Sequence, residues 1–231
     1  VEKNGRRWKT GTQNRTRILF LLRKTILNYT LTEEQELLQK TARDFAEKHL
    51  KPGVIERDEK AEVPLAQIKQ LGELGFMGIM VPEEWNGAGM DTVSYALAVE
   101  EISRIDASAG VMVSVNNSLV CQIFLDWAND QQRNKYLKKL AGGEWLGAFS
   151  LSEPQSGSDA SNMLTFAEKN NGHYILNGTK NWVSNGISSD VIIVFALTKK
   201  GIGHKGISAF LIEKGTPGLS TGKKEEKLGI R

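Results

Sequence analysis

The stretch Phe149-Ser-Leu-Ser-Glu-Pro-Gln-Ser-Gly-Ser-Asp159 decides how the whole chain is interpreted. It begins as a short strand, which must end at Glu153-Pro154 because proline has no backbone N–H and restricts the residue before it. Ser156-Gly157-Ser158 then offers hydroxyls, backbone N–H groups and a glycine that lets a ligand approach the backbone closely. The same residues would also suit a plain turn between strands, so the stretch alone leaves both readings open.

A second stretch, Lys180-Asn-Trp-Val-Ser-Asn-Gly186, follows about two dozen residues later. We interpret Lys180–Val183 as a strand, in which Trp182 supplies a flat face and Ser184 a hydroxyl two residues away on the same side. A flat aromatic ligand that carries a pyrophosphate would suit such a pair of loops. A tryptophan buried in the core is the alternative interpretation.

The hydrophobic periodicity changes from 3.6 to 2 at Glu144, which indicates a helical part followed by a sheet part. We therefore predict an α+β fold, with an all-helical domain over residues 30–143 and a small antiparallel β barrel or sandwich over residues 144–231. The expected helices begin at Thr32 (with a Thr32–Gln35 capping box), at Pro64 and after Asp91, and cover Ala109–Trp127 and Asp130–Leu140. The expected strands are Trp145–Ser152, Leu164–Glu168, His173–Leu176, Lys180–Val183, Val191–Leu197 and Ile207–Ile212.

Charge is distributed unevenly along the chain. Residues 1–30 hold eight basic residues and one acidic residue, so the remainder, with 22 basic and 26 acidic residues, carries a net charge of −4. A mildly acidic body gives no electrostatic support for nucleic-acid binding. We interpret residues 1–29 either as a mitochondrial transit peptide, because they are Arg-rich and acid-poor, or as a disordered or adventitious extension.

The cysteine content, the length of the apolar runs and the spacing of the histidines exclude several structural features. Cys121 is the one cysteine, which rules out an internal disulfide and suits a reducing compartment. No uninterrupted apolar run approaches the ~20 residues that span a bilayer, so we expect no membrane span. His49, His173 and His204 lack metal-ligand spacing, so we predict no metal site.

The two stretches resemble the flavin-binding signatures of the acyl-CoA dehydrogenase family, and the similarity is greatest to its short-chain (butyryl-type) members. Further matching motifs occur in the same order along the chain, from about Thr30 to the last residue. They are Val81-Pro-Glu-Glu-Trp-Asn-Gly-Ala-Gly89, Glu100-Glu-Ile-Ser-Arg104, Ser114-Val-Asn-Asn-Ser-Leu119, Gly206-Ile-Ser-Ala-Phe-Leu211 and Gly222-Lys-Lys-Glu-Glu-Lys-Leu-Gly-Ile-Arg231.

The resemblance implies that FAD is the cofactor and suggests which residues hold it. Gln155 and Ser161 stand where the family more often has glycine. Val111–Leu119 is expected to line the acyl pocket, although a plain buried helix would explain the same residues. The implied cofactor-binding residues are Phe149, Leu151, Ser152, Gly157, Ser158, Trp182, Val183 and Ser184, and Ser158 is also expected to meet the acyl-CoA.

The resemblance also implies an activity, which is α,β-dehydrogenation of a short-chain acyl-CoA to a trans-2-enoyl-CoA in fatty-acid β-oxidation. The implied partners are an electron-transfer flavoprotein and three further copies in a homotetramer, in the bacterial cytoplasm or the mitochondrial matrix, without secretion. The family's glutamate base lies in a C-terminal helical bundle. The sequence stops at Arg231, so we expect neither bundle nor catalytic residue in this chain. The alternatives are a non-catalytic FAD- or acyl-CoA-binding fragment and an acyl-CoA oxidase-like enzyme.

Overall fold

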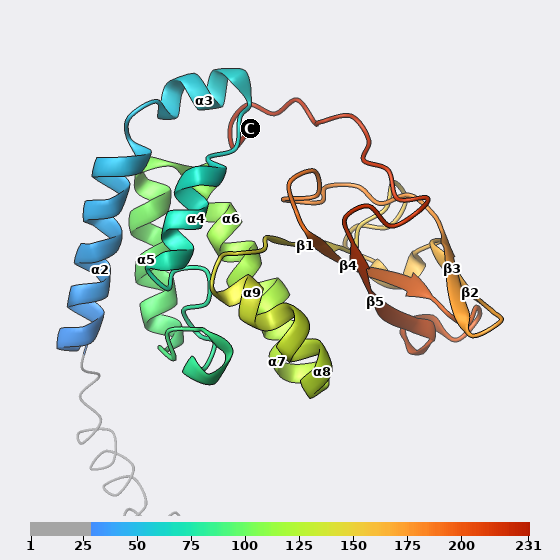
Figure 1. Cartoon of the computed structure of the whole chain (residues 1–231). Coiled ribbons are helices and arrows are strands. Elements are labelled where there is room, and N and C mark those ends of the chain that lie inside the picture. Colours follow the sequence, from blue (N-terminus) through green and yellow to red (C-terminus); the bar gives the residue numbers. More distant parts are fainter. Residues whose placement is uncertain (1–28) are drawn as a thin grey trace, which may run out of the picture.

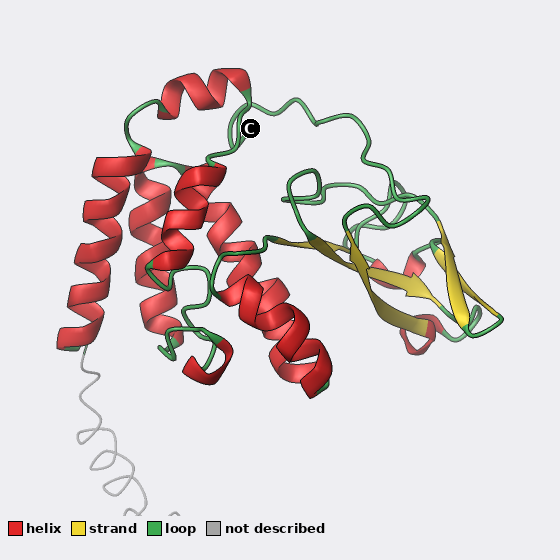
Figure 2. Ribbon diagram, in the orientation of Figure 1, coloured by secondary structure: helices red, strands yellow, loops and turns green. Residues whose placement is uncertain are grey.

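A computed structural model describes residues 29–231, so the predicted basic extension lies outside the described residues except for Tyr29. A helical part is followed by a sheet part, and the two lie beside each other (Figures 1 and 2). The helical elements are α2 (Glu33–Phe45), η1 (Ala46–Leu50), α3 (Val54–Lys60), α4 (Leu65–Glu73), η2 (Glu83–Trp85), α5 (Thr92–Ile105), α6 (Ala107–Ser114), η3 (Val115–Cys121), α7 (Gln122–Trp127), α8 (Asp130–Gln132), η4 (Arg133–Leu137) and α9 (Lys138–Ala141).

Local capping signals predicted the helix starts well. The Thr32–Gln35 capping box is present at the start of α2, and the Asp91 side chain accepts a hydrogen bond from the Ser94 backbone N–H at the start of α5. Helix α3 was not predicted. It begins directly after Gly53, whose φ of +76° lets the chain turn, and no side chain caps it. A start without a capping side chain leaves no local sequence signal.

The predicted helix over Ala109–Trp127 is confirmed and extends from Ala107 to Trp127, with a π-helical segment, η3, between α6 and α7. Within the described residues it is the one helix long and apolar enough to cross a membrane, by length and composition only. Half of its apolar window is buried inside the protein, and a single helix of this kind is weak evidence for a membrane span.

Two asparagines in this helix organise the core around it. Asn116 Nδ2 donates to the carbonyls of Met77 (2.8 Å) and Leu140 (3.0 Å), while its Oδ1 accepts from the Gly147 N–H (3.1 Å). Asn117 accepts from the Ile79 N–H at 2.7 Å and also donates to two carbonyls. Both amides are therefore fully bonded in the core, which answers why polar residues stand in an apolar helix.

The sheet part holds β1 (Gly147–Ser150), β2 (Phe166–Asn170), β3 (His173–Asn177), β4 (Val191–Leu197) and β5 (Ile207–Glu213), with the 3-10 turns η5 (Ala160–Asn162) and η6 (Gly203–Gly206). The prediction of an antiparallel barrel or sandwich is wrong, because the strands form one open, mixed sheet. β1 and β2 run parallel to β4 along one edge, β5 pairs antiparallel along its other edge, and β3 pairs antiparallel with β2. The long connection from β1 to β4 permits parallel pairing, which an alternating pattern cannot reveal.

The strands expected over Leu164–Glu168 and His173–Leu176, which we interpret as a hairpin about Asn170-Asn-Gly172, are present as the β2–β3 hairpin. It turns at Asn171 and Gly172, which both have positive φ. The prediction of a strand over Lys180–Val183 is wrong. These residues form an extended loop without ladder pairing, and Trp182 has a φ of +58°, outside the strand region. Trp182 and Ser184 are consequently not related by strand alternation.

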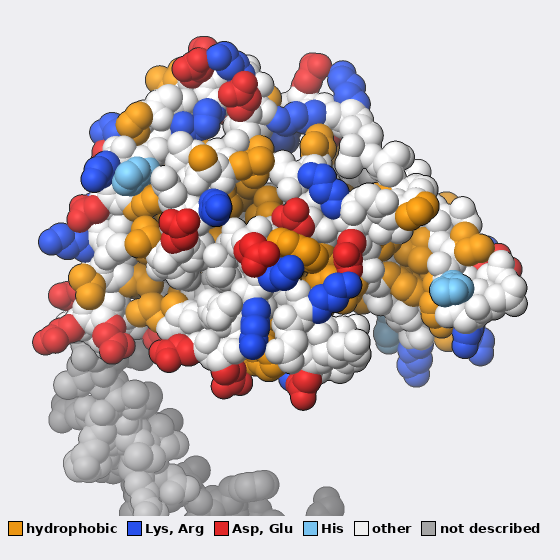
Figure 3. Space-filling view, viewed as in Figure 1, with side chains coloured by type: hydrophobic (Ala, Val, Ile, Leu, Met, Phe, Trp, Pro, Cys, Tyr) orange, Lys and Arg blue, Asp and Glu red, His pale blue; other side chains and the backbone are white. Residues whose placement is uncertain are grey.

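The sheet uses its two faces differently. Val191, Ile193 and Phe195 of β4 point toward η3, α7, η4 and α9, and hydrophobic side chains gather where the two parts meet (Figure 3). Ile192 and Val194 point to the other face, where they pack with Ala148. After β5 the chain runs back to the helical part without further helix or strand (Figure 1), where Lys224 donates to the Ala61 carbonyl.

Candidate functional site

A cavity of about 1640 Å³ lies between the helical part, the second face of the sheet and the C-terminal segment. Its helical wall includes Val111 and Met112 of α6, and its sheet wall includes Ser150, Ile192 and Val194. Single drug-sized ligands occupy pockets of roughly 300–1,000 Å³. This cavity therefore has room for a ligand larger than one such molecule.

Three of the eight predicted cofactor residues, Trp182, Val183 and Ser184, line this cavity. Trp182 is 67% exposed, so its ring is available to a ligand and is not a core side chain. Val183 packs against the sheet face formed by Ala148, Ile192 and Val194. The alternative interpretation of Trp182 as a core residue is wrong.

Three others, Phe149, Leu151 and Ser152, lie at the end of β1 but do not line the cavity. The Phe149 ring contacts Phe195, with ring centroids 5.1 Å apart, on the sheet face that meets the helices. The carbonyl of Leu151 accepts from Lys180 Nζ at 2.9 Å, and the carbonyl of Ser152 accepts from the Asn181 N–H at 2.8 Å. These bonds attach the second stretch to the first.

The last two, Gly157 and Ser158, lie in the exposed loop after β1 and also stand outside the cavity wall. A side chain built on Gly157 would meet nothing within 4 Å. The loop is nevertheless shaped from within, because Ser156 is buried and its hydroxyl donates to the Asp159 carbonyl at 2.8 Å. Gly157 and Ser158 are thus presented to solvent on a fixed turn.

Sequence reasoning did not single out Glu153 as a functional residue, yet it forms the best-bonded carboxylate of the region. Its Oε1 lies 2.8 Å from Lys180 Nζ, and the backbone N–H groups of Leu164 (2.5 Å) and Thr165 (3.0 Å) donate to its two oxygens. Burial alone would raise the pKa of Glu153, but these donors outweigh it and lower the pKa to about 2. The available signal was a glutamate before proline among small residues, with a lysine opening the second stretch.

Comparison with known protein families identifies the family to which this chain belongs. The model of the acyl-CoA dehydrogenase N-terminal domain matches residues 32–144, and the model of the middle domain matches residues 148–231. The chain belongs to the acyl-CoA dehydrogenase family. It is 49% identical over 200 residues to an acyl-CoA dehydrogenase of Bacillus subtilis and 46% identical over 201 residues to the mitochondrial short-chain specific acyl-CoA dehydrogenase of Bos taurus. Each alignment covers 87% of this chain, but 53% and 49% of the relatives.

Solved structures of the acyl-CoA dehydrogenase family agree with this placement. Butyryl-CoA dehydrogenase from Megasphaera elsdenii superposes with a TM-score of 0.85 at 43% sequence identity. The superposition covers 88% of this chain and 54% of the dehydrogenase chain. A chain in the structure of the electron transferring flavoprotein of Acidaminococcus fermentans superposes with a TM-score of 0.86 at 44% identity. This superposition covers 88% of the present chain and 54% of the other. A glutaryl-CoA dehydrogenase of Mycobacterium smegmatis in complex with FADH2 superposes with a TM-score of 0.81 at 34% identity. Here 87% of the present chain and 50% of the glutaryl-CoA dehydrogenase chain are covered. The chain spans about half the length of the relatives it matches.

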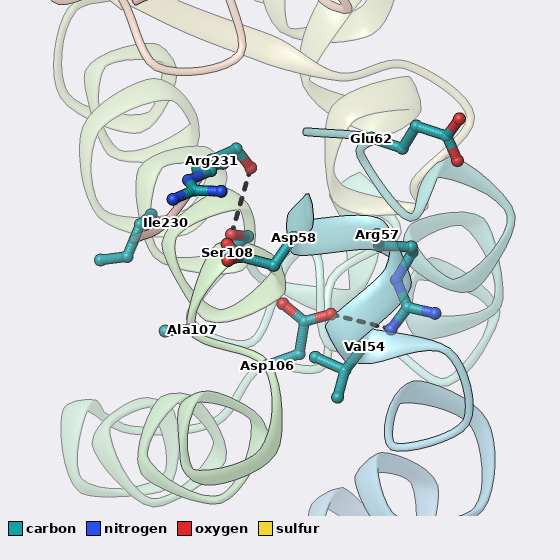
Figure 4. A pocket seen from close by; sticks show the side chains of 9 residues that line it. All are labelled: Val54, Arg57, Asp58, Glu62, Asp106, Ala107, Ser108, Ile230 and Arg231. Carbon is teal, nitrogen blue, oxygen red and sulfur yellow. Dashed lines mark hydrogen bonds and ion pairs between the residues drawn. The ribbon is translucent and has the colours of Figure 1, made fainter. Parts of the chain in front are cut away.

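A second cavity, of about 190 Å³, lies where the end of the chain meets the helical part of this family member (Figure 4). Two of its charged groups, Arg57 and Asp106, are bonded to each other. Arg57 bonds Asp106 at 3.0 Å, and the Ser108 hydroxyl donates to the Arg231 carbonyl at 3.3 Å. Since Arg57 also bonds the Leu50 and Pro52 carbonyls, it serves to join α3 to the neighbouring helices. The larger cavity is the better candidate site.

Neither metal binding nor a cysteine nucleophile is supported by the described residues. No group of three or more His, Cys, Asp or Glu within residues 29–231 could hold a metal ion. Cys121 is fully buried, and burial raises the pKa of its thiol to about 12. A buried thiol with such a pKa is a poor nucleophile at neutral pH.

Proposed function

We propose that this chain forms the N-terminal and middle parts of an FAD-dependent acyl-CoA dehydrogenase. The reaction would be α,β-dehydrogenation of a short-chain acyl-CoA to a trans-2-enoyl-CoA. The observation that carries the proposal is the exposed Trp182 ring on a large interdomain cavity, within a chain of this family. The high identity to short-chain and butyryl-CoA dehydrogenases favours a short acyl chain.

The residues present fit an FAD in both shape and chemistry. Trp182 offers an open aromatic face, Ser184 adds an exposed hydroxyl, and Gly157 leaves space for a phosphate to approach the backbone. When bound, FAD supplies a two-electron acceptor for hydride. We propose that Trp182, Val183 and Ser184 hold it on the cavity wall, and that the adjoining first stretch, which lies outside this wall, completes the site with Phe149, Leu151, Ser152, Gly157 and Ser158.

The acyl-CoA would lie between the helical wall and the flavin. Val111 and Met112 provide an apolar wall that suits an alkyl chain, and Ser158 would meet the CoA portion. Removal of an α proton next to a thioester requires hydrogen bonds to the carbonyl oxygen, because they stabilise the developing enolate. Exposed hydroxyls and backbone N–H groups at the two stretches are the available donors.

We place the catalytic base outside the described residues. The carboxylates on the cavity wall are Glu62 and Glu225, and both are exposed to water. A base for a weakly acidic α proton works best in a water-poor site with a tuned pKa, which neither provides. Glu153 is engaged by Lys180 and by two backbone N–H groups, so it is unsuited to accept a proton.

The same relatives support a proposal for the partners and the cellular setting. The match to a chain in the electron transferring flavoprotein structure supports such a flavoprotein as the electron acceptor. A bacterial cytoplasmic or mitochondrial matrix location accords with the bacterial and mitochondrial relatives. A homotetramer is proposed because it is typical of the family. The alternatives, a non-catalytic FAD- or acyl-CoA-binding chain and an oxidase-like enzyme, differ in whether the flavin is reduced and how fast oxygen reoxidises it.

The first test is to purify the chain, record its flavin absorbance and add butyryl-CoA without oxygen. Bound flavin that keeps its colour supports a cofactor site here and a base elsewhere. Bleaching means that a base lies within these residues. Rapid reoxidation by air after bleaching favours the oxidase-like alternative, and the absence of any flavin binding contradicts the proposed cofactor site.

Two variants test the site itself, and a third serves as a matched control. Trp182→Ala should weaken FAD binding by about tenfold, because an aromatic face worth roughly 1 kcal/mol or more is lost. Ser158→Ala should weaken FAD or acyl-CoA binding. Trp127→Ala removes a tryptophan that is even more exposed, at 84%, but lies on α7 outside the cavity wall, so it should leave both affinities unchanged.

A further inference from the structure

A buried ion pair joins the two stretches that the proposed flavin site depends on. The Glu153 and Lys180 side chains are only 2% and 9% exposed, and Glu153 Oε1 lies 2.8 Å from Lys180 Nζ. Buried charges are tolerated when they are paired and hydrogen-bonded, and both conditions hold here. The two residues are 27 positions apart, so the pair is a tertiary contact between separate loops.

Each member of the pair also holds the backbone around it. Glu153 accepts from the N–H groups of Leu164 and Thr165, where the loop after β1 returns toward β2. Gln155 adds a further bond, because its Nε2 donates to Glu153 at 2.6 Å. Lys180 Nζ also donates to the Leu151 carbonyl at the end of β1. The pair therefore fixes both loops against the same strand end.

Trp182 follows two residues after Lys180 in a conformation that the chain does not adopt freely. Its φ of +58° is left-handed, which is costly for a bulky side chain and persists only where the surroundings hold it. Its own ring cannot supply that hold, since it is mostly exposed. The holding contacts lie on either side: the Lys180 ion pair, the Asn181 N–H to the Ser152 carbonyl, and Asn185 Nδ2 to the Gly147 carbonyl at 3.1 Å.

We propose that Glu153 and Lys180 are positioning residues that keep Trp182 in its strained, exposed conformation and so preorganise the aromatic face of the ligand site. This inference rests on the proposed function for the nature of the ligand. Lys180 contributes to the cavity wall, but its amine is directed to Glu153 and the Leu151 carbonyl and not to a ligand. A rigid aromatic face binds a flat ligand more tightly than a mobile one, because less order is lost on binding.

The first experiment measures the loop without any ligand. Hydrogen exchange of residues 178–188 is compared by mass spectrometry in the flavin-free wild-type chain, Lys180→Met and Glu153→Gln. Both variants should exchange at least about tenfold faster in this segment, because the loop loses its hold. Glu153→Gln keeps a hydrogen-bonding side chain, so it provides a folded variant if Lys180→Met does not fold. Unchanged exchange in a folded variant overturns the proposal.

A matched control separates loss of positioning from loss of stability. Asp106→Asn disturbs the other buried ion pair, with Arg57, whose side chain is 15% exposed against 5% for Asp106. That pair lies among the helices and does not touch the 178–188 loop. Asp106→Asn should therefore leave exchange in this loop and FAD affinity unchanged, and equal changes in both properties would reduce the Glu153–Lys180 pair to a general structural role.

The second experiment asks whether the pair acts through Trp182. FAD affinity is measured for wild type, Lys180→Met, Trp182→Ala and the double variant. If Lys180 works by holding Trp182, its substitution weakens binding about tenfold in wild type but adds at most about twofold when Trp182 is already absent. Fully additive losses contradict the proposal. A wild-type chain that binds no FAD would refute the proposed function, while the hydrogen-exchange result would still decide whether the pair holds the loop.

Discussion

In the helical part, one neutral amide, Asn116, bonds backbone groups of three separate segments, whereas in the sheet part a charged pair, Glu153 and Lys180, does the equivalent work. The amide has no titration in the ordinary pH range and bonds three backbone groups besides the Cys121 sulfur, so it defines a permanent frame. The charged pair depends on ionisation and joins the two loops that carry the proposed ligand-binding residues. Both parts also contain the other kind of bond, since Arg57 and Asp106 pair among the helices and Asn185 bonds the Gly147 carbonyl near Trp182. The amide and the charged pair nevertheless each bond three backbone groups and can be compared directly.

The largest expected effect breaks the frame. Asn116→Ala leaves the Met77 and Leu140 carbonyls and the Gly147 N–H buried without this partner. At about 1–3 kcal/mol for each of these three unsatisfied groups, the free energy of unfolding should fall by about 3–9 kcal/mol. Urea denaturation at pH 7 measures it, with Asn134→Ala as the exposed control, whose Nδ2 bonds only the Asp130 carbonyl of its own helix. A loss below about 1 kcal/mol would mean that water replaces the amide.

The next effect breaks the charged pair. Lys180→Met leaves the Glu153 carboxylate buried without its counter-charge, which should lower the free energy of unfolding by about 3–5 kcal/mol. The double variant Lys180→Met with Glu153→Leu removes both charges, and it sharpens the comparison. It should recover only part of the loss, because the Leu164 and Thr165 N–H groups then lose their acceptor. Full recovery would show that these two backbone bonds contribute nothing.

Acid distinguishes the two kinds of bond directly. The folded pKa of Glu153 is about 2, below its ordinary value of 4.5, so its stabilisation is complete above about pH 4.5 and is lost as the pH falls toward 2. The shift corresponds to about 3 kcal/mol. The difference in stability between wild type and Glu153→Gln should therefore shrink over that window, whereas the cost of Asn116→Ala should stay constant. Equal pH dependence of both would argue that Glu153 titrates normally.

The sequence could predict features that depend on contacts between residues close together in the chain, and it could not predict those that depend on distant partners. The starts of α2 and α5 were predictable because Thr32 and Asp91 act within three residues of their partners. The β2–β3 hairpin was predictable for the same reason, since its turn residues lie next to each other. The direction of β4 relative to β1 was not, because about 40 residues separate them and alternation carries no direction.

The candidate site shows more clearly which features the sequence could not predict. The resemblance identified Trp182, Val183 and Ser184, and these residues do line one cavity. The strand predicted around Trp182 was wrong because the local pattern contains no trace of the partner 27 residues away that holds Lys180. The ion pair with this distant partner holds Lys180 in a loop, and local strand propensity carries no information about such a partner.

The smallest expected effect concerns the local capping bonds that made the helical part predictable. Thr32→Ala removes the hydroxyl that accepts the Gln35 N–H at 3.2 Å at the start of α2. The free energy of unfolding should fall by about 1 kcal/mol, and Thr32→Ser, which keeps the hydroxyl, should change it by only a few tenths. Hydrogen exchange should quicken in the first turn of α2 and nowhere near residues 178–188. A change that spread to that loop would mean that the frame and the site are coupled more tightly than two separate sets of buried bonds allow.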